Sequence, residues 1–84
     1  MHEGTVVREI MNIVSEAAYK NDISKVYEIC LRVGPYSCLH ENQLNWYFDI
    51  LNKGTIMENA IITIERDESI TGKNQMFIKT FKGE

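Results

Sequence analysis

The sequence predicts an α/β fold, a two-layer sandwich in which two helices cover one face of a three-stranded mixed sheet. Two stretches, residues 5–20 and 41–53, repeat apolar residues at three- and four-residue spacing, as amphipathic helices do. Three others, residues 25–33, 60–65 and 75–81, alternate apolar and polar residues, as half-buried strands do. The order helix, strand, helix, strand, strand gives a parallel pair through a right-handed crossover and then an antiparallel hairpin.

The first helix places its polar residues on one side and its apolar residues on the other. Glu3 lies near its positive end, where a carboxylate is favoured, and Glu16 with Lys20 forms an i,i+4 pair. We expect Asn21-Asp22 to end the helix. The apolar side consists of Val6, Val7, Ile10, Met11, Ile13, Val14, Ala17 and Ala18.

The first strand, residues 25–33, should turn its richer apolar face toward the helices. That face carries Tyr27, Ile29, Leu31 and Val33, and the opposite face carries Val26, Glu28, Cys30 and Arg32. Gly34-Pro35 breaks the strand, because proline lacks a backbone donor and has a fixed φ.

The second helix, residues 41–53, places Leu44, Tyr47, Phe48 and Leu51 on one stripe, with Trp46 and Ile50 flanking it. Lys53 in the last turn and Gly54 just beyond it indicate the C-terminal end.

In the second strand Ala60, Ile62 and Ile64 face one way, and in the third Met76 and Ile78 alternate with Phe77, Lys79 and Phe81. A polar turn, residues 66–74, joins the two strands. The outer sheet face is then a candidate surface for a homodimer or another partner, and it is expected to carry Val26, Cys30, Ile61, Phe77 and Phe81.

Composition narrows the class of protein. The 84 residues make one domain, 1–84, with 44% apolar and 25% charged residues. A net charge of −3 supplies no basic patch for phosphates, so no nucleic-acid partner is expected.

No apolar run reaches about 18 residues and no signal peptide is evident, so we expect a cytoplasmic protein without a membrane segment. Cys30 and Cys38 form no CxxC unit and should be thiols.

The first three residues, Met1-His2-Glu3, have the composition of a chelating terminus. Because His2 is too large for methionine aminopeptidase processing, Met1 should persist with a free amine. The amine, the His2 imidazole and deprotonated backbone amides form a flat nitrogen set, which suits Ni(II) or Cu(II) better than zinc. The alternative is an exposed, frayed and idle histidine.

Three stretches of the chain together form a recognisable pattern. They are the Met1-His2-Glu3 opening, the segment Leu31-Arg32-Val33-Gly34-Pro35-Tyr36-Ser37-Cys38, and Asn52-Lys53-Gly54-Thr55 followed by Glu58 and residues 60–65. In these stretches the chain resembles the HypA-type nickel metallochaperones of hydrogenase maturation and urease assembly. The similarity covers roughly residues 1 to 65.

The resemblance implies that the protein carries Ni(II) and that its partners are a nickel-handling GTPase and a nickel-enzyme precursor. The fold that it implies is the one that the periodicity predicts. It implies as ligands the Met1 amine, the His2 amide and imidazole, and the Glu3 amide or, less favoured, its carboxylate. The family inserts a zinc domain with two CxxC units where this chain has residues 66–74. We therefore expect no zinc domain and no structural zinc.

Two functions remain open on this reasoning. The first is a nickel-binding accessory protein that assists delivery to a hydrogenase or urease, and the second is an interaction module that has lost metal delivery and docks to a partner. An enzyme is not expected, because the one nearby thiol and imidazole, Cys38 and His40, lack an orienting acid and an oxyanion loop. His40 is either a capping or surface residue or an extra metal ligand.

Overall fold

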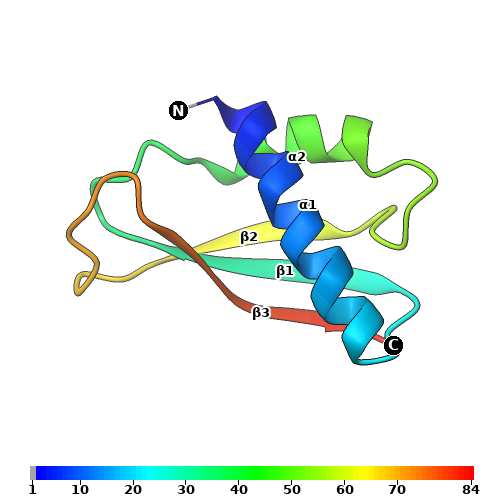
Figure 1. Ribbon diagram of the computed structural model, residues 1–84. Helices are drawn as coiled ribbons and strands as arrows, with labels where there is room; N and C mark the ends of the chain where they lie inside the picture. The colour runs from blue at the N-terminus through cyan, green and yellow to red at the C-terminus, as the bar shows by residue number, and fades with distance from the viewer. Residues whose placement is uncertain (1) are drawn as a thin grey trace.

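The computed structural model describes residues 2–84 and contains the predicted two layers (Figure 1). Its sheet has the strand order β2-β1-β3, with β1 parallel to β2 and antiparallel to β3. Both helices lie on one face of this sheet (Figure 1), so the predicted fold class is confirmed. The elements in chain order are α1 (Glu3–Lys20), β1 (Val26–Val33), α2 (Glu41–Leu51), β2 (Ile61–Arg66) and β3 (Met76–Gly83).

Helix α1 begins two residues earlier than the apolar periodicity indicated, with His2 as its N-cap residue. The predicted Glu16–Lys20 ion pair is present at 3.2 Å. At the other end, the Asn21 side-chain amide donates to the Ala17 carbonyl at 2.7 Å and the Asn21 backbone N–H also turns back to the last carbonyls. These bonds satisfy acceptors that a helix end leaves open, so the chain leaves the helix where predicted.

Helix α2 ends at Leu51, two residues before the predicted end at Lys53. The cause is Asn52, which is fully buried and donates from Nδ2 to the Met57 carbonyl at 2.9 Å. That bond holds a turn in place of another helical residue, and Gly54 follows with φ of +76°, a conformation that favours glycine.

The core lies between the helices and the inner sheet face, where the sequence placed it. From their places on the predicted inner faces, ten residues are expected to be buried there. Leu51 and Ile64 are half-buried against this core, and the other eight are at most 1% exposed. These eight are Val7, Ile10, Val14, Ile29, Leu31, Leu44, Phe48 and Ile62.

The prediction of faces was wrong at the start of β1. Val26 is fully buried, whereas Tyr27 is 46% exposed. The pairing of β1 with β3 shifts between Val26 and Glu28, which leaves Tyr27 as an extra residue, as in a β-bulge. The bulge reverses the alternation, so Val26 turns inward and the Tyr27 hydroxyl bonds to the Glu84 carboxylate outside.

The prediction was also wrong at Phe81, which packs against the core instead of the outer face. A second shift, between Cys30 and Leu31, makes Lys79 the extra residue of β3, so Ile78 and Phe81 both point inward. The outer face keeps Phe77 and Ile61, each 52% exposed. It also carries the Lys79–Glu65 pair at 2.6 Å and the Lys82–Glu28 pair at 3.9 Å, so it is more charged than predicted.

The segment that joins β2 to β3, residues 67–75, is a short loop, and the Arg66 guanidinium at its start holds the segment between β1 and α2. Arg66 donates to the carbonyls of Gly34 at 3.1 Å, Ser37 at 3.2 Å and Leu39 at 2.9 Å. Neither helix within residues 2–84 is long and apolar enough to cross a lipid bilayer.

Candidate metal centre

His2 lies at the start of α1 in an extended conformation, with φ of −89° and ψ of 123°. Its side chain is exposed and makes no capping hydrogen bond, while its carbonyl accepts the N–H groups of Thr5 and Val6, both at 3.1 Å. The backbone carbonyl of His2 is therefore bonded within the helix, and its imidazole makes no hydrogen bond to the described residues 3–84. The predicted ligand Met1 lies outside the described residues.

The amide nitrogens next to this imidazole belong to the first turn of a helix. The first four N–H groups of an α-helix have no carbonyl four residues earlier to bond with. Glu3 is the first residue of α1, so its amide can lose a proton to a metal without breaking an intrahelical bond. The amide of His2 precedes the helix and has the same freedom. Local structure thus leaves two backbone nitrogens available beside the imidazole.

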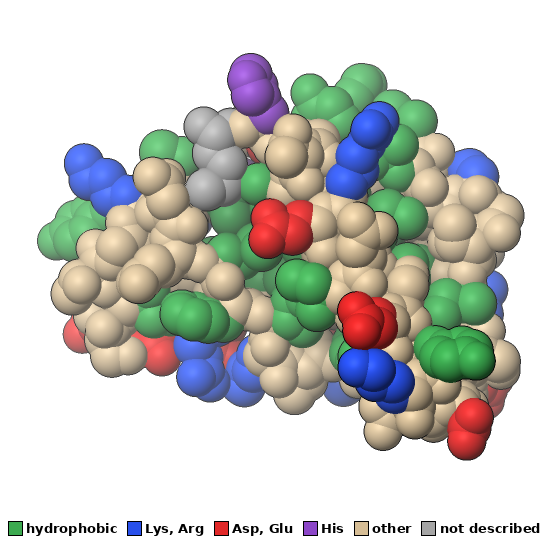
Figure 2. All heavy atoms as spheres, viewed as in Figure 1, with side chains coloured by type: hydrophobic (Ala, Val, Ile, Leu, Met, Phe, Trp, Pro, Cys, Tyr) green, Lys and Arg blue, Asp and Glu red, His purple; other side chains and the backbone are tan. Residues whose placement is uncertain are grey.

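A cavity of about 440 Å³ lies beside His2, between the start of α1 and the second half of α2. Gly4 is packed closely there, because a Cβ atom built on it would lie 3.5 Å from Cδ1 of Tyr47. The Tyr47 ring meets the Trp46 ring edge to face, with centroids 5.0 Å apart. Figure 2 shows hydrophobic side chains gathered over α2 on this side of the molecule. The cavity is lined by His2, Gly4, Thr5, Arg8, Trp46, Tyr47, Ile50 and Leu51.

Arg8 brings a positive charge to the same cavity. A guanidinium disfavours a nearby bare dication, since like charges repel. Two deprotonated amides would neutralise Ni(II) and remove that repulsion, whereas neutral ligands alone would not. A nitrogen set that includes amidates would therefore be compatible with the charge of Arg8.

The Glu3 side chain lies away from this cavity, although Glu3 is next to His2 in sequence. It is half-buried and lines a smaller hollow of about 190 Å³ with Gln43, Trp46 and Tyr47. Its backbone nitrogen is the group that stays beside His2. This arrangement is compatible with the Glu3 amide as a ligand and gives its carboxylate a role at the helix N-terminus.

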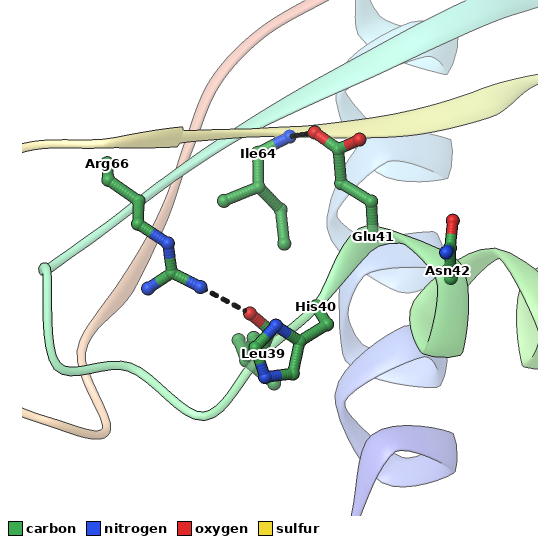
Figure 3. A pocket seen from close by; sticks show the side chains of 6 residues that line it. All are labelled: Leu39, His40, Glu41, Asn42, Ile64 and Arg66. Carbon is green, nitrogen blue, oxygen red and sulfur yellow. Dashed lines mark hydrogen bonds between the residues drawn. The ribbon is translucent and has the colours of Figure 1, made fainter.

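His40 lines a different cavity, of about 340 Å³, with Leu39, Glu41, Asn42, Ile64 and Arg66 (Figure 3). It is the N-cap residue of α2, is exposed, and makes no side-chain capping bond. Cys38 is an exposed free thiol two residues before it. Within residues 2–84, no three side chains of His, Cys, Asp or Glu lie together as a metal-binding group. The structure thus brings His2 beside α2 but places the two histidines in separate cavities.

Sequence reasoning missed the residues that form the wall beside His2. In the sequence, Trp46 and Ile50 flank the apolar stripe of the second helix, and Arg8 is one of the polar residues on the other side of the first helix. Trp46 is 63% exposed and Ile50 is 56% exposed, so both side chains line the cavity instead of packing inside the core. Only the packing of α1 on α2 shows that they meet the terminus.

Comparison with known proteins finds one family over most of the chain. Residues 1–72 match the HypA family, described as hydrogenase/urease nickel incorporation, metallochaperone. The hydrogenase maturation factor HypA of Actinobacillus succinogenes is 39% identical over 62 residues, which are 74% of this chain and 55% of that protein. The HypA of Methanothermobacter thermautotrophicus is 35% identical over 65 residues, or 77% of this chain and 53% of that protein. The chain thus spans about half the length of these two relatives.

Solved structures agree on the fold. The solution structure of the Ni metallochaperone HypA from Helicobacter pylori superposes with a TM-score of 0.81 at 18% identity, covering 99% of this chain and 97% of that one. A second solution structure, of a HypA protein, gives a TM-score of 0.74 at 16% identity. At such low identity these likenesses establish the shared fold and nothing further.

Proposed function

The chain belongs to the HypA family of hydrogenase and urease nickel-incorporation metallochaperones, and on that premise we propose that it binds one Ni(II) at Met1-His2-Glu3. The ligands in this proposal are the Met1 amine, the His2 amide and imidazole, and the Glu3 amide. The protein then assists delivery of the metal to a hydrogenase or urease. It acts as an accessory protein, in keeping with relatives named as maturation factors.

The observation that supports this proposal best is the state of His2 at the start of α1. Its imidazole is exposed and forms no capping bond, and the neighbouring amides lie where a helix needs no donor. These four nitrogens come from adjacent residues at a chain terminus and can coordinate one ion in a plane. Ni(II) and Cu(II) accept planar coordination by nitrogen, whereas zinc favours a tetrahedron.

An exposed terminal site also suits a cargo that must be released. Partner ligands can approach an exposed ion and replace the nitrogens one at a time. Because the amides must lose protons to bind, metal affinity should fall steeply as the pH falls. By family resemblance, the receiving partners are a nickel-handling GTPase and the precursor of the nickel enzyme.

We propose further that residues 1–84 form one nickel-binding domain that needs no structural zinc. The loop 67–75, which joins β2 to β3, contains no cysteine. Cys30 lies on β1 and Cys38 precedes α2, and within the described part of the chain neither belongs to a group of three or more His, Cys, Asp or Glu side chains that could hold a metal. Two separate thiols do not make the four-ligand site of structural zinc.

The second candidate is an interaction module that keeps the fold and docks through the outer sheet face. Exposed Phe77 and Ile61 favour it, since both side chains are about half open to solvent. The ion pairs of Glu65 with Lys79 and of Glu28 with Lys82 separate these apolar residues, and Val26 and Phe81 are not among them. The face is therefore a weaker candidate than the sequence suggested.

Equilibrium dialysis against Ni(II) separates the two functions. The wild-type protein should bind about one Ni(II), His2→Ala should bind none, and the control His40→Ala should bind as the wild type does. Trp46 is the only tryptophan and lines the His2 cavity, so nickel should change its fluorescence in step with binding. Equal binding by wild type and His2→Ala would refute the site, and absence of binding in all three would favour the docking module.

A further inference from the structure

A cavity with charged and apolar walls lies on the outer face of the sheet, which the helices leave uncovered (Figure 1). Its volume of about 520 Å³ lies in the range of small-molecule sites. It is separate from the cavity beside His2, which lies between the two helices on the other face. Its walls include Arg32 on β1, Asp67, Ser69 and Ile70 in the loop between β2 and β3, and Phe77 and Lys79 on β3.

The loop between β2 and β3 reaches this face because it crosses directly over Gly34. A Cβ atom built on Gly34 would overlap the carbonyl oxygen of Ile70, so the crossing needs a residue without a side chain. The Asp67 N–H then donates to the Val33 carbonyl at 2.8 Å, and the Ile70 side chain is buried. These contacts hold Asp67 and Ser69 beside the end of β1.

The Arg32 guanidinium has one ion pair and no hydrogen bond to the other residues among 2–84. In the ion pair, Arg32 Nε lies 3.6 Å from Asp67 Oδ2, which is too long for a hydrogen bond, although Nε is buried. The other oxygen of Asp67, Oδ1, accepts the N–H and the hydroxyl of Ser69, at 2.9 and 2.7 Å, and these bonds hold the carboxylate in place. A buried donor without a partner costs free energy, and a guanidinium has five donors in one plane. Arg32 therefore offers a planar set of donors to a ligand.

Lys79 is the second cation of the cavity. One of its three N–H groups donates to Glu65 at 2.6 Å, which leaves two for another acceptor. Together with the guanidinium, the ammonium gives the cavity unpaired donors, and a ligand rich in acceptors would match them. Asp67 and Glu65 balance the charges of Arg32 and Lys79, so a singly charged carboxylate fits better than a doubly charged phosphate.

Phe77 gives the same cavity an apolar wall. It lies directly opposite Arg32 in the pairing of β1 with β3, and its side chain is 52% exposed. An aromatic ring next to a guanidinium can bind a ligand that has both an apolar and an anionic part, because the apolar part packs on the ring while the anion meets the donors. The two residues therefore specify an amphipathic ligand.

We propose that this cavity binds a monocarboxylate that carries an apolar or aromatic body. The carboxylate accepts two parallel hydrogen bonds from Arg32, Lys79 attracts it further, and the body packs on Phe77. Two sources offer this chemistry, namely the C-terminus of a polypeptide that ends in an apolar residue and a free aromatic acid. Because the cavity and His2 lie on opposite faces of the sheet, this binding does not depend on the nickel proposal.

The test is titration of the isotope-labelled full chain with N-acetylphenylalanine, followed by heteronuclear NMR of the backbone amides. This probe has a carboxylate near an aromatic ring and resembles the end of a peptide, and N-acetylphenylalanine amide has the same ring without the charge. The acid should shift the amide signals of Arg32, Ser69 and Phe77, and the neutral amide should bind about tenfold more weakly. The signals of Gly4 and Thr5, in the cavity beside His2, should not move.

Two substitutions separate the contact to the carboxylate from the contact to the ring. Arg32→Lys keeps the charge but removes the planar pair of donors, so it should weaken binding of the acid about tenfold. Phe77→Thr removes the aromatic wall and should weaken binding about fivefold. Ile61→Thr is the matched control and should bind as the wild type does, because Ile61 is also 52% exposed on the outer face but does not line the cavity.

Phenylpropionate and inorganic phosphate complete the comparison with the wild type. Tighter binding of N-acetylphenylalanine than of phenylpropionate would support the site with a polypeptide C-terminus as its ligand, and the reverse order would support it with a free acid. Absence of binding by both acids, equal binding of N-acetylphenylalanine and its amide, unchanged binding by Arg32→Lys, or tighter binding of phosphate than of either acid would each overturn the proposal.

Discussion

The clamp that Asn45 forms on the β2 edge predicts a measurable loss of stability. Its amide makes two hydrogen bonds to the backbone of Ile62, both 2.8 Å long, and a third to the Glu41 carbonyl at 3.0 Å. Asn45→Ala removes all three and leaves the N–H and carbonyl of Ile62 without their partners.

The expected cost is about 2 kcal/mol, since each bond of this kind contributes roughly 1 kcal/mol and the third, within α2, is offset by the higher helix propensity of alanine. Asn45 is only half-buried, so water recovers part of the loss and the value should not exceed about 3 kcal/mol. For a domain of this size, the corresponding fall in Tm is roughly 8–16 °C.

The assay is urea unfolding followed by circular dichroism, with Asn42→Ala as control. Asn42 lies on the same helix, is exposed, and has no hydrogen bond to the sheet, so its replacement should change the free energy of unfolding by less than about 0.5 kcal/mol. Equal stability of the two variants would show that the Asn45 clamp contributes nothing and that the β2 edge is held in another way.

Three further predictions concern the core, zinc and acid. Leu31→Ala and Phe48→Ala should each lower the free energy of unfolding by roughly 2–5 kcal/mol, because both side chains are fully buried; a loss below about 1 kcal/mol in denaturant melts would contradict the packing. A metal chelator should leave the circular dichroism and Tm of the purified protein unchanged, and unfolding on chelation would show a structural metal. Hydrogen bonds from the hydroxyl and backbone N–H of Ser69 hold the pKa of Asp67 below its usual range. A lowered folded-state pKa stabilises the protein above about pH 4 and ceases to do so as the pH falls through the folded value, so the advantage of wild type over Ser69→Ala should shrink toward pH 2 in urea melts.

The sequence alone was sufficient for the order of elements, because amphipathic periodicity is a local signal and the right-handed crossover rule leaves few topologies. It failed where one extra residue changes the side-chain alternation. Tyr27 and Lys79 are each unpaired in the β1–β3 ladder, and nothing in the local composition distinguishes them from regular strand residues. Those two bulges decide that Val26 and Phe81 lie inside.

The candidate site shows the same division. His2 could be proposed as a ligand from sequence because chelation by a chain terminus depends only on neighbours along the chain. The wall formed by Trp46 and Tyr47, more than forty residues away, depends on how α2 packs against Gly4. The position of Arg8 at the cavity likewise depends on how the two helices pack. The positive charge of Arg8 is the basis of the argument for amide ligands.

The central claim is that the terminal amine, His2 and the first amides of α1 bind nickel together. The most direct measurement compares the Ni(II) absorption spectrum of the untagged protein with that of the protein carrying an N-terminal tag. The untagged protein should give the yellow, diamagnetic spectrum of one square-planar nitrogen site and bind Cu(II) more tightly still. The tag converts the amine to an amide, so the tagged protein should lose this spectrum as fully as His2→Ala does, and removal of the tag without residual residues should restore it. Equal nickel binding by tagged and untagged protein would contradict the chelate, even though the family assignment would stand.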